Sequence, residues 1–338
     1  MLNRKCRIPQ AAAGLRRLAA ILACSLFPAL AGQAPAQSPA TSPARVAAAA
    51  RPGDDALPDK ALVRFGEARL MHGVPIKCLA FTADSKRIFA AGGQYGMNGD
   101  ITVWDADTGV LVRTIDGPTN GVLSMSLPQK GPSDTGVLCG MSDRKVRTFS
   151  VKDGPLSLRQ PSAARTVTYW LALSPDGSLM GCADSSRLTV ERRDSGTQLF
   201  QIPKATAGAF SDDGKLLAVT STRDTNFGLE VWDVQAGMKL LSIEAAKSKR
   251  MTSPAFSHDG KMVAAAFYGT SDQKVMIWDV QTGKVLHTLE GAGRYVNEMV
   301  FLPDDKRIVA TDRLGQPKVW KLGDKQPQDL PGTEARMD

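Results

Sequence analysis

A pattern that repeats at steps of 41 to 46 residues constrains this chain more than any other feature of its sequence. Each copy begins with an apolar run, a tight polar turn and a second apolar run. The clearest copies are CLAFTADSKRIFAA at 78–91, LALSPDGSLMGCA at 171–183, GAFSDDGKLLAVT at 208–220, PAFSHDGKMVAAA at 254–266 and MVFLPDDKRIVAT at 299–311. Self-similarity at this period indicates a repeat architecture, in which each unit is stacked on the next.

Each copy continues into a third apolar segment that ends in an aromatic residue, an acid and a glycine turn. Clear examples are ITVWDADTG at 101–109, LEVWDVQAG at 229–237 and VMIWDVQTG at 275–283. The aligned aromatic position holds Trp104, Phe149, Glu191, Trp232, Trp278 and Trp320. Because one small sheet cannot bury both of its faces, these units predict an all-β fold, a β-propeller of four-stranded blades. Six blades can be counted, and a total of seven blades stays open as an alternative.

The polar turns contain residues that close hairpins for defined physical reasons. In Ser-Pro-Asp-Gly at 174–177, proline presets one backbone angle, aspartate bonds its own backbone and glycine accepts a positive φ. The same chemistry recurs at 211–214 and 257–260. We therefore expect the first two strands of each unit to form a tight hairpin.

These units resemble the WD-repeat family, and the resemblance extends over residues 61–332. In that family a turn histidine, a strand hydroxyl, a turn aspartate and the tryptophan bond to one another and lock the blade. The resemblance gives structural roles to His72, Trp104, Asp143, Trp232, Asp272, Trp278 and Trp320. Only Asp143 and Asp272 keep the acid of the family pattern, so the blades are degenerate.

Two segments compete to complete the last blade. In the family a lone outermost strand commonly does so and couples the chain ends, which would give this role to ALVRFGEARLMHG at 61–73. The other candidate is QPQDL at 326–330, where Pro327 would remove one ladder hydrogen bond. Two outcomes stay open: one of these strands is redundant, or the chain forms a partial seventh blade.

The segments outside the repeats have a different composition. Residues 1–31 combine basic residues, an apolar run and the small residues of Ala29-Leu30-Ala31, which indicates a signal peptide. Residues 32–60, rich in Ala, Pro and Ser, predict a flexible linker, and 333–338 a disordered tail. We expect an exported protein, periplasmic or secreted, with no transmembrane anchor after cleavage. Lipidation or retention of the segment stays open.

Charge and cysteine usage exclude some partners and ligands. The formal net charge is +8, but five basic residues lie in 1–31 with no acid, so the remaining chain carries +3 and no nucleic-acid partner is expected. Outside that segment, Cys78, Cys139 and Cys182 fall at unrelated spacings in different repeats, which favours small buried side chains. We expect no metal and no cofactor.

No constellation of catalytic residues stands out, so we expect a protein that is not an enzyme. His72 fits the blade-locking role. His258, in a hairpin turn, and His287, in an outer strand, are expected on the solvated surface. The alternative is a propeller enzyme, a lactonase- or lyase-like hydrolase with a site at the central channel.

In the WD-repeat fold, the connections between second and third strands and the turns before each first strand emerge on one face, called here the loop face. Aromatic and arginine side chains, which are enriched at interface hot spots, would lie there. These candidate partner-binding residues are Tyr95, Arg165, Arg223, Phe227, Arg250, Tyr268, Arg294 and Arg313. The sequence predicts a non-catalytic scaffold that binds a protein or peptide, and the arginines favour an acidic partner. The oligomeric state stays unknown.

Overall fold

The protein is known from a computed structural model that describes residues 76–92, 101–115, 121–129, 137–141, 146–149, 170–221, 224, 228–245, 249–268, 274–292, 295–311 and 317–328. These residues form six antiparallel sheets, which are the blades. The expected all-β propeller is therefore confirmed. In the part of the chain so described, no helix is long and apolar enough to cross a membrane.

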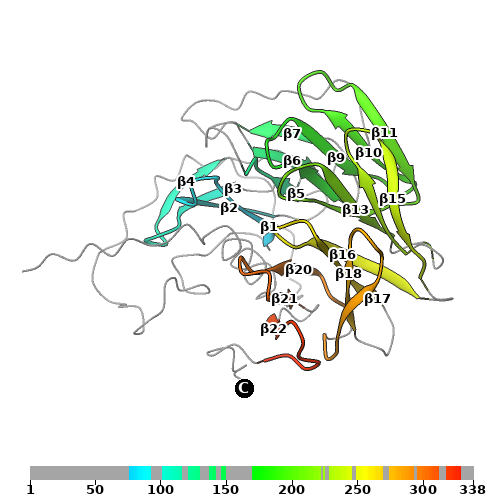
Figure 1. Cartoon of the computed structure of the whole chain (residues 1–338). Helices are drawn as coiled ribbons and strands as arrows, with labels where there is room; N and C mark the ends of the chain where they lie inside the picture. Colours follow the sequence, from blue (N-terminus) through cyan, green and yellow to red (C-terminus); the bar gives the residue numbers. More distant parts are fainter. Residues whose placement is uncertain are drawn as a thin grey trace, which may run out of the picture.

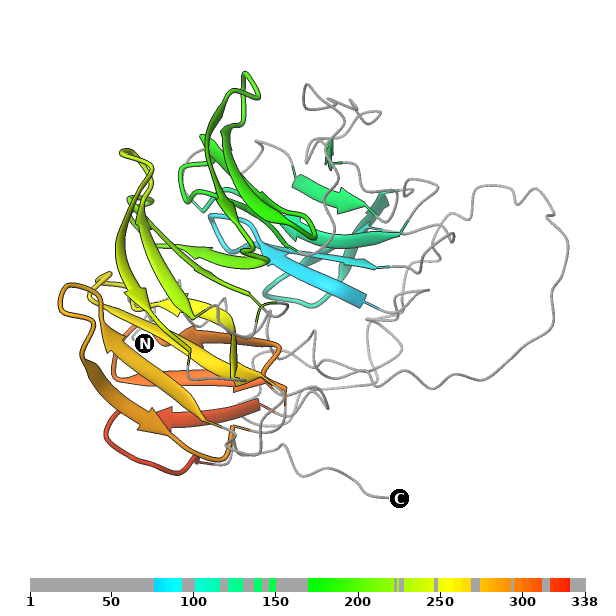
Figure 2. The ribbon, with the colours of Figure 1, turned by 90° about the vertical axis from the view of Figure 1, so that its right-hand side faces the viewer.

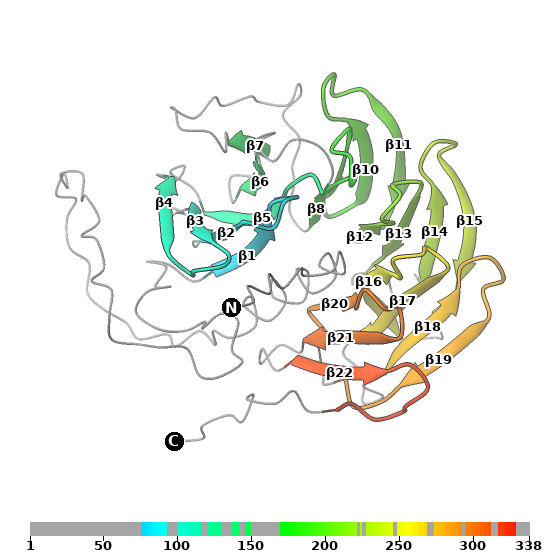
Figure 3. The same ribbon diagram turned by 60° about the vertical axis from the view of Figure 1, so that its left-hand side comes forward.

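The strands of each blade follow one another in chain order from the centre outward (Figure 3). The first strands are β1 (Ile76–Phe81), β5 (Val122–Ser126), β8 (Trp170–Leu173), β12 (Ala207–Phe210), β16 (Arg250–Phe256) and β20 (Glu298–Phe301). The second strands are β2 (Arg87–Gly92), β6 (Val137–Met141), β9 (Leu179–Ala183), β13 (Leu216–Thr220), β17 (Met262–Tyr268) and β21 (Arg307–Thr311). The third strands are β3 (Ile101–Asp105), β7 (Val146–Phe149), β10 (Arg187–Arg192), β14 (Leu229–Asp233), β18 (Val275–Asp279) and β22 (Pro317–Lys321). The fourth strands are β4 (Leu111–Ile115), β11 (Gln198–Pro203), β15 (Met238–Ile243) and β19 (Val285–Leu289).

The blades, numbered 1 to 6 along the chain, follow one another around a common axis (Figure 1). Their first strands lie against one another in the order β1, β5, β8, β12, β16 and β20. Figure 2 shows the sheets of blades 3, 4 and 5 side by side. This arrangement covers both faces of an inner blade with neighbouring sheets.

The apolar core lies between the blades. Five clusters of buried side chains each combine two consecutive blades, from the pair 1 and 2 to the pair 5 and 6. In β17, for example, Val263 belongs to the cluster shared with blade 4 and Ala264 to the cluster shared with blade 6. The second strands read as continuous apolar runs because alternate residues pack against different neighbours.

The aligned aromatic positions occupy equivalent places in the six third strands. Each is paired in register with a second-strand residue, as Ile88–Trp104, Val137–Phe149, Met180–Glu191, Leu217–Trp232, Val263–Trp278 and Ile308–Trp320. Trp278 packs in the cluster shared with blade 4, and Trp320 in the cluster shared with blade 5. The tryptophan therefore covers the face of the preceding blade, which confirms that the sequence period is a stacking unit.

The indole nitrogens find a different acceptor in each of three blades. Trp104 donates to Thr102 Oγ1 at 2.9 Å, and Trp232 donates to Glu230 Oε2 at 3.0 Å. Trp320 donates to the carbonyl oxygen of Glu290 at 2.9 Å. This variety fits the degenerate pattern of the sequence. His72, Asp143 and Asp272 lie outside the described residues, so their structural roles stay predictions.

The polar turns form the expected hairpins. In blade 3, Ser174 Oγ donates to Asp176 Oδ1 at 2.6 Å and accepts from the Leu179 amide at 2.9 Å, while Gly177 has a φ of 73°. Blades 4 and 5 repeat this network. Ser85 and Asp305 adopt the same positive φ where blades 1 and 6 lack the glycine, at 62° and 50°.

Two segments, 61–73 and 326–330, are the candidates for the outermost strand of the last blade. In its described part, residues 326–328, the candidate segment 326–330 contributes one bridge, in which the Gln328 amide donates to the Val319 carbonyl at 2.7 Å. The alternative strand at 61–73 lies outside the described residues. Two further apolar clusters draw on one blade each, blade 1 around Trp104 and blade 6 around Val309. Blades 2 and 6 have three strands each in the described parts.

The cysteines lie in strands of three different blades. Cys139 and Cys182 are buried, Cys78 is partly buried, and none of these three forms a disulfide. Burial raises the pKa of the Cys139 thiol. The expectation that these residues act as small apolar side chains is therefore confirmed for Cys139 and Cys182.

We predict that Trp278→Ala lowers the free energy of unfolding by about 3–5 kcal/mol, because it opens a cavity between blades 4 and 5. Urea denaturation followed by circular dichroism measures this loss. The control is Leu286→Ala in the same blade, whose exposed side chain should change stability by less than about 0.5 kcal/mol. Equal losses in both variants would contradict the stacking role of the tryptophan.

The turn carboxyls predict an acid-sensitive fold. Burial raises the pKa of Asp176, but hydrogen bonds from Ser174 and Ser178 outweigh it and leave the pKa below its ordinary value. The pKa is also lowered for Asp84, Asp213, Asp259 and Asp304. Each carboxyl then contributes stability that is present above its unfolded value of about 3.9 and is lost as the pH falls through the lower folded value.

We therefore expect the urea midpoint to fall as the pH drops below about 4, and to fall less steeply in Asp176→Asn, which cannot ionise. The comparison needs both proteins at pH 6, 4 and 3. Parallel profiles would mean that this carboxyl contributes no pH-dependent stability.

Candidate functional site

The two ends of the blades are built differently. At one end, called here the turn face, the first and second strands of five blades are joined by turns of equal length at 82–86, 174–178, 211–215, 257–261 and 302–306, and only blade 2 has a longer connection, at 127–136. At the opposite end, the loop face, the connections between second and third strands vary, from 184–186 in blade 3 to 93–100 in blade 1 and 221–228 in blade 4. Variable connections on a uniform scaffold are where binding residues concentrate.

Six of the eight candidate partner-binding residues fall outside the described residues. They are Tyr95, Arg165, Arg223, Phe227, Arg294 and Arg313. Their placement by sequence, in connections that would open onto the loop face, stays a prediction.

The structure brings the other two candidates together. Arg250 is the first residue of β16 and Tyr268 the last of β17, and the two are paired in register at the loop end of blade 5. Arg250 is partly exposed. A basic side chain therefore lies on a strand end directly opposite an aromatic residue, an association that the sequence separation conceals.

The same strand ends hold a cation–aromatic pair that the sequence analysis missed. The Lys249 ammonium lies 5.4 Å from the centroid of the Phe267 ring, within the range of a cation–π contact. Phe267 is itself paired with Met251 in register. The loop end of blade 5 thus combines two basic residues, Lys249 and Arg250, with an aromatic ring that is only partly buried. Lys249, next to the candidate Arg250, could have been found by its position in the turn before the first strand.

A second missed contact lies at the loop end of blade 4. Lys204 precedes β12 with a φ of 66°, and its ammonium lies 2.8 Å from Asp224 Oδ2 in the connection between β13 and β14. The Lys204 side chain is largely exposed, so this ion pair contributes little to stability. The ion pair links the turn before a first strand to a connection between second and third strands, and these are the two kinds of segment that make up the loop face.

The outer rim offers a different surface. In each fourth strand a β-bulge opposite the aligned aromatic position leaves one residue unpaired, and that residue is an exposed large apolar side chain. These residues are Val112, Leu199, Leu240 and Leu286, with exposed fractions of 46%, 39%, 56% and 44%. The rim is the second candidate binding surface, and sequence alternation alone does not reveal it because the bulge breaks the period.

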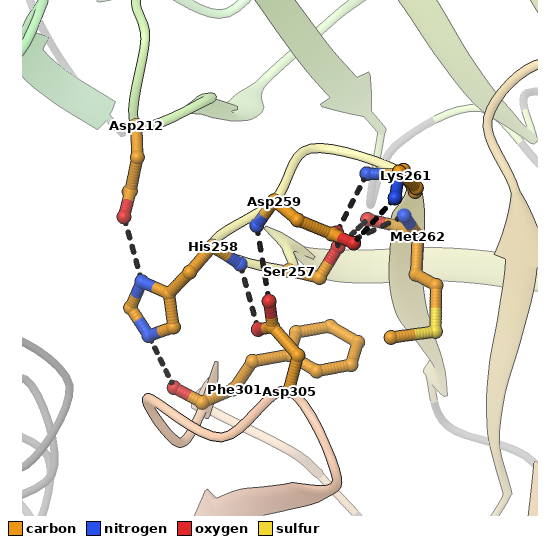
Figure 4. Close-up of polar contacts among 8 residues, drawn as sticks. All are labelled: Asp212, Ser257, His258, Asp259, Lys261, Met262, Phe301 and Asp305. Atoms are coloured by element: carbon orange, nitrogen blue, oxygen red, sulfur yellow. Dashed lines mark hydrogen bonds and ion pairs between the residues drawn. The ribbon is translucent and has the colours of Figure 1, made fainter.

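One expectation about the turn face is wrong. His258 is not a solvated surface residue, because its side chain is 17% exposed and contacts both neighbouring blades (Figure 4). His287 lies in β19 with partial exposure, in agreement with an outer-strand position. Within the described ranges no group of three or more His, Cys, Asp or Glu side chains gathers as a metal site would require.

Comparison with known proteins gives matches to both sequence and fold. The family model described as WD domain, G-beta repeat matches residues 69–105 and 238–279. A chain of the crystal structure of the mitotic checkpoint complex superimposes with a TM-score of 0.61 at 16% sequence identity, over 73% of this chain and 76% of that chain. Because 1529 chains of solved structures match, the fold alone does not select one function. No curated protein matches the sequence.

Proposed function

This chain is a WD-repeat β-propeller, and from that premise we propose that it is an exported, non-catalytic scaffold that binds a protein or peptide through its loop face. Propellers of this family are in general protein-interaction scaffolds. A rigid ring of stacked sheets holds the connections of separate blades in fixed positions, so a partner meets a surface that is already organised.

The loop end of blade 5 is the observation that carries the proposed face. Arg250 and Tyr268 are register partners there, and Lys249 lies over the ring of Phe267. Aromatic and arginine residues that meet on a fixed scaffold are the composition of an interface hot spot. In contrast, the turn face uses its polar groups in internal hydrogen bonds of the hairpins.

An acidic partner fits this face best. Lys249 and Arg250 present positive charge at blade 5, and the predicted arginines of the neighbouring connections would extend it. Such a patch would steer an acidic peptide toward the face and fix its orientation more than it would raise the affinity.

Export is supported by the sequence of the first 31 residues, which carries the charge and apolar pattern of a signal peptide. The proposal therefore places the scaffold in the periplasm or outside the cell, where its partner would be an envelope or secreted protein.

We predict that the double variant Arg250→Ala, Tyr268→Ala retains no more than about one tenth of the partner that the wild type retains, because two residues of hot-spot type are removed from paired strand positions. Affinity capture from the cell envelope, with the bound protein quantified by mass spectrometry, measures this loss. An unchanged thermal midpoint would show that the variant is folded.

The matched control is Leu240→Ala, Leu286→Ala, which removes two exposed side chains from the rim of blades 4 and 5. We expect this variant to retain the partner at the wild-type level. Loss of the partner in the rim variant, with full retention in the loop-face variant, would move the binding surface to the rim and overturn the proposal.

A further inference from the structure

Three consecutive hairpin turns meet on the turn face, at 211–215 in blade 4, 257–261 in blade 5 and 302–306 in blade 6. Figure 4 shows the imidazole of His258 between the Asp212 side chain and the backbone of Phe301. Asp212 and His258 occupy the same position of successive turns, directly after the serine that begins each one. One side chain of blade 5 thus contacts both adjoining blades.

Both ring nitrogens of His258 face oxygen atoms that accept hydrogen bonds. Nδ1 lies 2.6 Å from Oδ2 of Asp212, and Nε2 lies 3.1 Å from the carbonyl oxygen of Phe301. A carbonyl oxygen has no proton to give, and an ionised carboxylate has none either. Neutral imidazole carries one N–H, whereas imidazolium carries two. Only the protonated ring satisfies both contacts at once.

The surroundings of the ring also favour its positive charge. The carboxylate of Asp305, from blade 6, accepts the backbone amides of His258 at 2.8 Å and of Asp259 at 3.0 Å. Asp212 of blade 4 faces the ring directly, while Asp259 and Lys261 of the same turn are paired with each other at 3.5 Å. The two neighbouring turns also carry Asp213, which is paired with Lys215 at 3.7 Å, and Asp304, which is paired with Arg307 at 2.8 Å, together with Lys306. Among the described residues, carboxylates therefore face His258 from both sides of blade 5.

We propose that His258 is a proton-operated latch that ties blades 4, 5 and 6 together on the turn face when its ring is protonated and releases one of its two contacts when the proton leaves. With the proton gone, a lone pair on one ring nitrogen faces an oxygen at hydrogen-bond distance. That contact turns from attractive to repulsive, and the carboxylate of Asp212 no longer faces a charged ring.

The direction of the pH dependence follows from this geometry. The folded protein binds the proton more tightly than the unfolded chain does, because two acceptors and a carboxylate stabilise the charged ring. The latch therefore contributes its full stability below about pH 6.5, the ordinary value for histidine, and loses it as the pH rises through the higher folded value. Acid within this range tightens the three blades, and alkali loosens them.

The test is a titration of the full chain with carbon-13-labelled histidine, followed by NMR of the ring Cε1–H signals. The chain contains three histidines, and His258→Gln assigns the signal of interest by its disappearance. We expect the His258 midpoint to lie above about 6.5 and to fall in Asp212→Asn, which keeps the shape of the partner but removes its charge. A midpoint at or below that value, or one that Asp212→Asn leaves unchanged, overturns the latch.

A second readout separates proton sensing from simple loss of packing. The thermal midpoint of His258→Gln is compared with that of the wild type at pH 6 and pH 9. We expect a clear deficit at pH 6 that shrinks at pH 9, because the wild-type ring has then lost its proton. An equal deficit at both pH values would assign His258 a purely structural role and overturn the proposal. His287→Gln, the matched control in the same blade, should show no pH-dependent deficit.

Discussion

Each blade of this protein is a small sheet with two apolar faces, and it is stable only when a neighbouring sheet covers each of them. The second strands show this requirement most clearly, since Val263 packs toward blade 4 and the adjacent Ala264 toward blade 6. Trp232, Trp278 and Trp320 meet the same need, because each packs in the cluster shared with the preceding blade. Stability is therefore a property of the joints between blades, as expected for a protein built from stacked repeats.

The stacking of the blades leaves three regions of the surface with different roles. The turn face is fixed by hydroxyl–carboxylate networks such as that of Ser257 and Asp259, and by contacts from one blade to the next. At the loop face, the connections between second and third strands vary in length and can carry binding residues. The rim lies between them, where bulges turn one apolar side chain per fourth strand outward. A scaffold of this kind can change its partner without changing its core.

The contacts of His258 cannot be predicted from the residues next to it in the sequence. The sequence around 257–260 predicts a tight turn, and the turn forms as expected. The ring, however, reaches a carboxylate 46 residues earlier and a carbonyl 43 residues later in the chain. Each separation is close to one repeat, so stacking brings His258 next to the equivalent turn residue of blade 4 and to the end of the first strand of blade 6. The pairing of Arg250 with Tyr268, by contrast, lies within blade 5 and follows from the register of β16 and β17.

The sequence by itself determined the repeat period, the hairpin turns, the apolar second strands and the alignment of the aromatic positions, because each of these follows from the residue pattern within one repeat. It also placed the candidate binding residues on connections, although most of those lie outside the described residues. Only the tertiary structure decided which side chains meet across the joints, where His258 is held, and which rim residues the bulges expose. These features depend on the packing of one blade against another, and a local pattern carries no information about the distance between two turns.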